Sequence, residues 1–207
     1  MKLIIDAGPA LNFLAVGQQN ILIQASAHHT LQLAAPERVD AEVEGKCRDE
    51  RFRRTGALGT WRTLRVAGRI EILSDAIESD QVLAAAVTRV AGQPASERMR
   101  ERRSLGEILA IAHASGLAQQ GHHVVLLIDD SDGRRRSKDE IAYLQHNTAP
   151  GSITLWGTPG VLGMAGAHQG WILADRTPEQ AYDQMRAFDD GLPDRNGRLL
   201  PRPSAEA

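Results

Sequence analysis

The amino-acid sequence predicts a three-layer α/β/α fold, in which helices cover both faces of a central parallel sheet. Residues 124–130 read VVLLIDD, and such a continuous apolar run is typical of a strand that is buried on both faces. Shorter apolar runs alternate along the chain with helix-like segments, as in parallel strands joined by crossover helices. The length of 207 residues suits one domain, for which we expect residues 1–190, followed by a C-terminal tail over 191–207.

The first predicted elements are defined by short apolar runs and by the residues that end them. A strand is expected over residues 2–6, where an acid and a Gly-Pro pair stop the apolar run, and a helix follows from about Pro9. A second strand over residues 31–35 ends at Pro36, a residue type that suits the first turn of a helix. We therefore expect the next helix over residues 37–52.

The rest of the chain continues this alternation. A strand is expected over residues 69–73, and the helix after it has Asp80 as its N-cap and Gly92 just beyond its end. The following segments predict, in order, a helix within 104–123, a strand over 124–130, a helix over 138–146, a strand over 153–156, a helix over 159–167, a strand over 171–174 and a final helix over 178–188.

Composition and charge exclude several classes of protein. With 42% hydrophobic and 24% charged residues the chain can bury a core, and no apolar run approaches the roughly 18 residues needed to cross a bilayer. The N-terminus does not read as a signal peptide and the single Cys47 excludes an internal disulfide, so we expect a cytoplasmic protein. A formal net charge of −2 argues against a generally basic nucleic-acid binder.

One stretch of the chain is nonetheless strongly basic. Between residues 46 and 69, eight basic residues stand against two acids and are interleaved with Phe52 and Trp61, and we interpret 46–69 as a basic insertion. Arginine-rich segments are usually solvated faces, but RNA that approaches an acidic centre needs positive charge nearby to neutralise its phosphates. The candidate RNA-contacting residues are Arg51, Arg53, Arg54 and Arg134.

Acidic residues gather where the predicted strands end and the helices begin. Three of them follow strands, namely Asp6, Asp129 and Asp130, while Glu42 and Glu107 lie near the beginnings of helices. Ligands bind an open parallel sheet outside the carboxyl ends of its strands, so these carboxylates are expected to converge there. Converging carboxylates without a basic partner repel one another and favour a hard cation, Mg²⁺ or Mn²⁺. Such a cation supports phosphodiester hydrolysis, because it activates water and stabilises the leaving oxygen.

Five segments occur along the chain in a consistent order: IIDAGPALNFL, APERVDAEV, LGEILAIAHASGL, VVLLIDDSDGRR and WGTPGVLGMAGAHQGWI. Together they resemble the successive motifs of PIN-domain ribonucleases, most closely the bacterial branch that contains the VapC-type toxins. The resemblance spans residue 3 to about residue 190. By this resemblance, the four acids of the family fall on Asp6, Glu42, Glu107 and Asp130, with Asp129 as an accessory metal ligand.

The resemblance implies a function and partners. A chain similar to this family is expected to be a metal-dependent endoribonuclease that hydrolyses RNA with Mg²⁺ or Mn²⁺, as the toxin of a type II toxin–antitoxin pair. It is also expected to form a homodimer and to bind an antitoxin protein, a segment of which occupies the acidic groove. Gly8 departs from the family pattern, because many members have Ser or Thr there. Any hydroxyl role at that position is therefore absent or supplied elsewhere.

Each of these acids also has a structural interpretation. Asp6 could close a strand by accepting backbone N–H bonds in the turn. Glu107 stands three residues after Ser104, which is the spacing of a capping box at a helix start. Neighbouring acids compete for the remaining roles: Asp40 and Glu44 with Glu42, and Asp132 with Asp129 and Asp130.

Two other functions fit parts of the sequence. The first is a catalytically inactive PIN-like module that binds RNA or a protein, which the presence of all four family acids disfavours. The second, more remote, is a receiver-type phosphoacceptor domain with Asp130 and Asp175 as its acids. A receiver requires a lysine well beyond the second acid, and the sequence has no lysine after Lys138.

Overall fold

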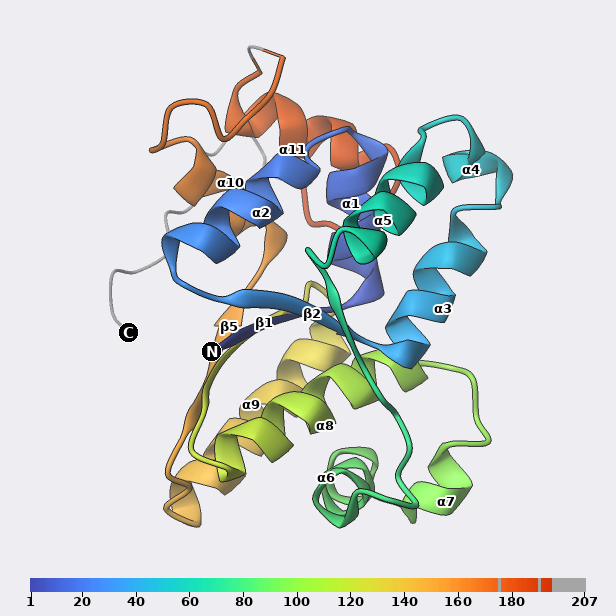
Figure 1. Cartoon of the computed structure of the whole chain (residues 1–207), viewed down its shortest axis with the longest axis vertical. Helices are drawn as coiled ribbons and strands as arrows, with labels where there is room; N and C mark the ends of the chain where they lie inside the picture. The colour runs from blue at the N-terminus through green and yellow to red at the C-terminus, as the bar shows by residue number, and fades with distance from the viewer. Residues whose placement is uncertain (175, 190, 195–207) are drawn as a thin grey trace.

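A five-stranded, all-parallel sheet forms the centre of the computed structural model, which describes residues 1–174, 176–189 and 191–194 (Figure 1). The strand order is β3-β2-β1-β4-β5, so that β1 is central and pairs with β2 on one side and β4 on the other. The strands are β1 (Lys2–Ile5), β2 (Gln32–Pro36), β3 (Glu71–Leu73), β4 (His123–Leu127) and β5 (Ser152–Trp156). The sheet and its flanking helices confirm the predicted three-layer α/β/α class.

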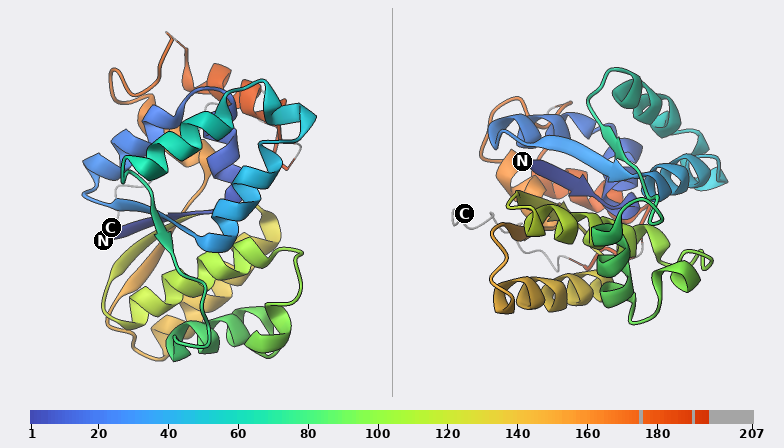
Figure 2. Two further views of the ribbon diagram at one scale, coloured as in Figure 1. Left: turned by 45° about the vertical axis from the view of Figure 1, so that its right-hand side comes forward. Right: turned by 60° about the horizontal axis from the view of Figure 1, so that its bottom comes forward.

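Two groups of helices cover the two faces of the sheet (Figure 2). The first group packs into one core cluster and comprises α1 (Ala7–Ala15), α2 (Gln19–His28), α3 (Glu37–Lys46), α4 (Glu50–Arg53), α5 (Ala57–Val66), α10 (Thr158–Ala165) and α11 (Pro178–Arg186). The second group packs into the other cluster and comprises α6 (Gln81–Ala91), α7 (Ala95–Arg98), α8 (Leu105–Gln119) and α9 (Ser131–His146). No helix among the described residues is both long and apolar enough to span a membrane.

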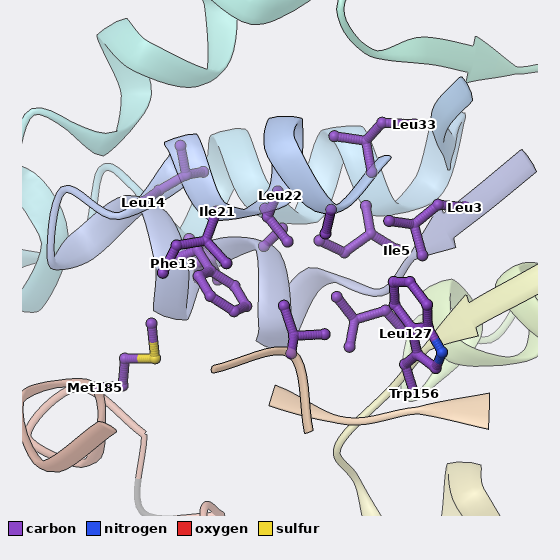
Figure 3. Close-up of a cluster of buried hydrophobic side chains, with 14 of the residues drawn as sticks. Leu3, Ile5, Phe13, Leu14, Ile21, Leu22, Leu33, Leu127, Trp156 and Met185 are labelled. Carbon is purple, nitrogen blue, oxygen red and sulfur yellow. The ribbon is translucent and has the colours of Figure 1, made fainter. Parts of the chain in front are cut away.

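The central strands are apolar on both faces because each face meets a separate core. Successive side chains of a strand point to opposite faces of a sheet. In β1, Leu3 and Ile5 accordingly join the first cluster and Ile4 joins the second. Figure 3 shows Leu3 and Ile5 beside Leu33, Leu127 and Trp156 in the first cluster. The sheet thus fixes the positions of β1 and β4, whose carboxyl ends carry the acids of interest.

The predicted strand over residues 171–174 is wrong. This segment is a loop in which Trp171 is buried and Ala174 has a φ of 62°. The backbone of Leu173 bonds to the side chain of Gln18, which donates to its carbonyl and accepts from its N–H. The apolar run therefore covers the core as a loop and contributes no strand to the sheet.

Two helix boundaries also differ from the prediction. The helix expected over residues 37–52 ends at Lys46, and a short separate helix, α4, follows it. The helix expected over 138–146 begins already at Ser131, because the Asp130 side chain accepts the backbone N–H groups of Asp132 and Gly133 and caps it. The predicted caps Asp80 and Gly92 are confirmed for α6: the Asp80 side chain accepts the Leu83 N–H, and Gly92 has a φ of 72°.

The basic stretch over residues 46–69 folds into α4 and α5, which pack with the helices of the first group. Trp61 is almost fully buried, and its indole N–H donates to Asp40 Oδ1 at 2.7 Å. The stretch is therefore anchored in the domain core. Of the expected tail over 191–207, residues 195–207 lie outside the described residues, as does Asp175, the second acid of the receiver interpretation.

Candidate functional site

A polar cavity of about 290 Å³ opens at the carboxyl ends of β1 and β4. The five acids that the sequence singles out all line it, as does a sixth acid that the sequence analysis missed. Its lining comprises Asp6, Ala7, Gly8, Pro9, Glu42, Lys46, Ser104, Glu107, Asp129, Asp130, Asp189 and Gly191. Carboxylates dominate this lining, and among the described residues that form it, Lys46 alone is cationic.

The strand order explains why acids that are far apart in the sequence meet here. Asp6 follows β1 directly, and its backbone N–H donates to the carbonyl of Leu127, the last residue of β4. Asp129 and Asp130 follow β4 by two and three residues. Since β1 and β4 are paired and parallel, their carboxyl ends share one edge of the sheet, which is where ligands bind in such folds.

Asp6 stands at the N-cap position of α1, but its side chain makes no capping hydrogen bond. Burial raises the pKa of this carboxyl from 3.8 to about 6, and the negative charge of Glu42 adds to the rise. The nearby backbone N–H groups and the Lys46 ammonium act in the opposite direction and do not offset it. The N–H groups of Ala7 and Gly8 thus interact with the Asp6 carboxyl as the turn interpretation expects, but burial outweighs them in setting its pKa.

Glu107 is the most unusual carboxylate of the cavity. It lies in the first turn of α8 with 8% of its surface exposed, and its Oε1 atom is buried without a hydrogen-bond partner. Burial, and then the charges of Asp130 and Asp6, raise the pKa of Glu107 from 4.5 to about 7. The nearest cation, Arg136, places Nε 3.9 Å from Oε1, beyond hydrogen-bonding distance.

The capping box that could explain Glu107 is not formed. Ser104 occupies the N-cap position of α8 in the left-handed region, with a φ of 51°, and its side chain makes no capping hydrogen bond. Instead, Glu107 packs against the backbone of Gly133 at the start of α9: a Cβ added at Gly133 would lie 2.8 Å from the Glu107 carboxyl carbon. The absence of a side chain at Gly133 therefore makes room for this acid.

Glu42 points into the cavity from α3, whereas the two competing acids of that helix do not line it. Asp40 accepts the Trp61 indole N–H, and Glu44 accepts hydrogen bonds from Arg62 and Arg65 of α5. The pattern supports Glu42 as the acid of this helix that belongs to the site.

Gly106 creates the space that Glu42 occupies. A Cβ at Gly106 would lie 2.7 Å from Glu42 Oε2, closer than such contacts allow. The other carboxylate oxygen of Glu42 accepts a hydrogen bond from Arg38 Nε at 2.9 Å, one turn earlier on α3. The Gly-Glu pair at the start of α8 thus helps to place two acids in the site: Gly106 leaves room for Glu42, and Glu107 is itself the second acid.

Asp129 and Asp130 are held in different ways. Asp129 is fixed by Thr158 at the start of α10, with Oδ1 accepting the backbone N–H at 2.7 Å and Oδ2 accepting the hydroxyl at 2.5 Å. Burial raises the pKa of Asp129, and the hydrogen bonds from Thr158 act against that rise. Asp130 Oδ1 accepts the backbone N–H groups of Asp132 and Gly133, so this atom has a structural role as the cap of α9. Asp132 is exposed and pairs with Arg135 and Arg136.

Asp189 was missed because the pair of acids at 189 and 190 comes after the last predicted helix and follows no predicted strand. Its place is set by the buried side chain of Asn12 on α1, whose Nδ2 donates to Asp189 Oδ2 at 2.8 Å. The backbone N–H of Gly191 donates to Oδ1. Only the fold brings α1 and this C-terminal segment together, although the polar Asn12 within an apolar helix was a weak signal of a buried partner.

The basic residues of the sequence analysis divide into two groups. Arg134 extends toward the sheet edge, where its Nη1 donates to the carbonyls of Ile128 and Trp156, a structural use of the side chain. Arg53 and Arg54 are exposed, and Arg51 lines a second cavity beside the acidic one. Three further arginines of the region pair with Glu44: Arg48, Arg62 and Arg65. Contact of any of these residues with RNA stays a prediction.

The donor chemistry of the cavity fits Mg²⁺ or Mn²⁺, which both favour carboxylate oxygens. The observation that supports the fit is Glu107 Oε1, a buried acceptor without a partner, in a cavity that is lined by further carboxylates. Along the part of the chain that the structure describes, no three His, Cys, Asp or Glu side chains form a ready metal-binding group. The acids thus line the same cavity, but no three of them among the described residues already converge on a point where an ion would sit.

No family model, curated protein or solved structure matches this chain. The resemblance to PIN-domain ribonucleases consequently rests on the sequence segments themselves and stays a prediction. The chemistry of the site has to be argued from its own geometry, charge and burial.

Proposed function

We propose that this protein is a metal-dependent ribonuclease that hydrolyses RNA phosphodiester bonds in the acidic cavity. The observation that carries the proposal is the state of Glu107, a buried carboxylate that lies near the charges of Asp130 and Asp6 and has one oxygen without a hydrogen-bond partner. A folded protein rarely leaves a buried carboxylate oxygen without a partner unless a ligand or proton satisfies it. A divalent cation is the ligand that carboxylates of this kind take most readily.

Electrostatics favours a cation in this cavity, and protons compete with it less as the pH rises above the pKa values of Asp6 and Glu107. Each close pair of carboxylates repels by about 1 kcal/mol or more in a partly screened cavity. The raised pKa values of Asp6, about 6, and Glu107, about 7, record this repulsion together with burial. Asp6, Glu42, Glu107, Asp129 and Asp130 would hold the ion. When bound, Mg²⁺ or Mn²⁺ supplies a Lewis acid that polarises a phosphoryl oxygen and lowers the pKa of bound water.

The chain's own residues orient the site for a phosphate. Asp129 is held in one position by both hydrogen bonds from Thr158, so its orientation is fixed before any ligand arrives. Lys46 extends from the end of α3 into the cavity lining, where an ammonium can contact a phosphate oxygen.

The surroundings of the cavity favour a nucleic-acid substrate. The helix α4, with Arg51 and Arg53, and the loop between α7 and α8, with Arg102 and Arg103, lie on the same side of the molecule as the end of α3 (Figure 1). Exposed arginines beside an acidic centre can contact the phosphates on either side of the bond that is cleaved. RNA as the substrate, a toxin role, an antitoxin partner and a homodimer all rest on the family resemblance.

The proposal is tested by cleavage of labelled RNA with Mg²⁺, with Mn²⁺ and with excess EDTA. We expect cleavage with either metal and none with EDTA, because the cavity needs the cation to bring a phosphate near its carboxylates. Asp6→Asn, Glu107→Gln and Asp130→Asn should each lower cleavage by at least about 100-fold, since each removes one ionised oxygen from the site. Full cleavage in EDTA would contradict the metal mechanism.

Glu44→Gln is the matched control, because Glu44 lies on the same helix as Glu42 but pairs with the arginines of α5. It should leave cleavage within about twofold of the wild type, whereas Glu42→Gln should lower it strongly. An inactive Glu44→Gln beside an active Glu42→Gln would mean that the wrong acid of α3 has been assigned. Tight RNA binding without cleavage by the wild type would instead support the inactive binding module.

A further inference from the structure

A second cavity of about 260 Å³ adjoins the acidic one. Three residues, Gly8, Lys46 and Asp189, line both cavities, so the two lie side by side and share a wall. The other residues of the second cavity are Leu11, Asn12, Asp49, Arg51, Phe52 and Phe188. Nothing in the proposed hydrolysis uses this second space.

The chemistry of the second cavity differs from that of the first. Its walls include the apolar side chains of Leu11, Phe52 and Phe188, which come from α1, α4 and the segment after α11. The rings of Phe52 and Phe188 are stacked, with centroids 5.6 Å apart and planes inclined by 29°. Phe52 is buried, whereas Phe188 is only partly buried and keeps part of its surface toward solvent. This composition suits a planar aromatic ligand better than an ion.

The charged residues that line the second cavity are two acids, Asp49 and Asp189, and two cations that a phosphate backbone can contact. Lys46 stands on the wall that the two cavities share, and Arg51 lines the second cavity from α4. In a single-stranded nucleic acid each base is joined through its sugar to a phosphate, so a base site and a phosphate site must be neighbours. Single-strand binding sites combine exactly these two elements, aromatic surfaces for the bases and cations along the backbone.

We propose that the second cavity holds one base of a single-stranded RNA, next to the phosphate that is cleaved. This inference rests on the proposed ribonuclease function and adds to it a subsite for one base. The base packs against Phe188 and Leu11, and Lys46 contacts the phosphate between this base and the acidic cavity. The volume of about 260 Å³ lies just below the range of drug-sized ligand sites, which suits a single base that is turned into the cavity. The substrate must therefore be unpaired at this position.

Binding of a short fluorescein-labelled single-stranded RNA, measured by anisotropy with Ca²⁺ in place of Mg²⁺, tests the site without requiring cleavage, because Ca²⁺ can occupy a carboxylate site without supporting hydrolysis. Removing one base at a time from the oligonucleotide should reveal one position that weakens binding by roughly 5- to 100-fold, the range seen for loss of one stacked base. Phe188→Leu should weaken binding of the intact RNA to a similar extent. Phe188→Tyr, which keeps the ring, should restore it.

The combination of variant and substrate separates a base contact from a merely structural role of Phe188. If the ring holds that base, the abasic RNA should bind Phe188→Leu and the wild type equally, because the contact is already lost. An abasic penalty that is unchanged in Phe188→Leu would overturn the proposal. So would wild-type binding that is insensitive to every abasic substitution, or equal affinity for a fully paired duplex.

Cleavage kinetics on the same oligonucleotides distinguish failure of this inference from failure of the proposed function. With both correct, Phe188→Leu should raise KM and change kcat by less than about threefold, since the base lies beside the reacting bond and not at it. A wild type that shows the abasic penalty in binding but cleaves nothing would support the base site and reject the ribonuclease. Absence of RNA binding would reject both.

Discussion

Two buried glutamates on neighbouring helices differ in their hydrogen-bond partners: one is fully paired and the other is not. Glu140 of α9 is 3% exposed, accepts hydrogen bonds from Arg89 of α6 at 2.5 to 3.1 Å, and also accepts the hydroxyl of Ser115. Glu107 of α8 is 8% exposed, yet one of its oxygens has no partner and its pKa is raised to about 7. The helices α8 and α9 pack directly against each other.

The contrast shows what a structural carboxylate looks like in this protein. At Glu140 the chain supplies a bidentate arginine and a hydroxyl, so the desolvation of the charge is compensated and α6, α8 and α9 are tied together. At Glu107 the fold places other carboxylates nearby and keeps Arg136 beyond hydrogen-bonding distance. A glutamate in the second environment costs stability, and a role in binding explains why it is present.

The largest effect on stability is expected at the satisfied glutamate. Arg89→Met leaves Glu140 buried without its cation and should lower the free energy of unfolding by about 3–5 kcal/mol. Denaturant titration followed by circular dichroism measures this loss. The double change Arg89→Met with Glu140→Leu should recover most of it, because no charge remains buried. A loss below about 1 kcal/mol for the single variant would show that the pair is not structural.

At Glu107 we expect the opposite effect on stability, namely a rise in the free energy of unfolding when the charge is removed. Its pKa is raised on folding, so the stability it contributes is fully present below about pH 4.5 and is lost as the pH rises through about 7. Without metal, Glu107→Gln should therefore match the wild type at pH 4.5 and exceed its stability by about 2–3 kcal/mol at pH 8. Melting curves in EDTA across this range test the sign. A less stable variant at pH 8 would place Glu107 in a structural role.

How far these sites could be predicted depends on where each residue lies. Asp6 and Asp129 follow apolar strands, and the parallel arrangement of those strands requires their ends to meet, so local pattern was sufficient. Asp189 lies in a C-terminal segment that tertiary contacts hold in place, among them the hydrogen bond from Asn12 and the stacking of Phe188 on Phe52, and no local pattern encodes these contacts. The apolar run around Trp171 fits a strand equally well in sequence, but Gln18 bonds to the Leu173 backbone and holds the segment as a loop.

A smaller change in stability with a clear change in activity is expected from Gly106→Ala. The new Cβ would lie 2.7 Å from Glu42 Oε2, and the end of a flexible side chain can move aside. The free energy of unfolding should change by less than about 1 kcal/mol, since alanine also favours the helix. Cleavage should fall about tenfold or more because Glu42 leaves its position. Gly59→Ala on α5, where a Cβ meets nothing within 4 Å, is the control and should leave cleavage unchanged.

The smallest effect is expected at the exposed arginines of the basic stretch. Arg53→Ala combined with Arg54→Ala should weaken RNA binding similarly for all sequences and lower the slope of log K against log salt by about 1 to 2. The paired arginines provide the comparison: Arg62→Ala with Arg65→Ala removes the partners of Glu44 and should affect stability more than the salt slope. An unchanged salt slope for the Arg53 and Arg54 variant would show that these two arginines are solvent-exposed and do not contact RNA.

The central claim is that the carboxylates of the acidic cavity form a metal site, and thermal melting with and without Mg²⁺ tests it most directly. At a metal concentration 100 times the dissociation constant, binding stabilises the folded protein by about 2.7 kcal/mol, which a melt resolves easily. We expect Mg²⁺ to raise the Tm of the wild type, and to raise it more at pH 8 than at pH 6, because Asp6 and Glu107 must lose protons to bind. Asp6→Asn should melt higher than the wild type in EDTA and should not respond to Mg²⁺. A wild type that is indifferent to Mg²⁺ and Mn²⁺ at both pH values would contradict the claim.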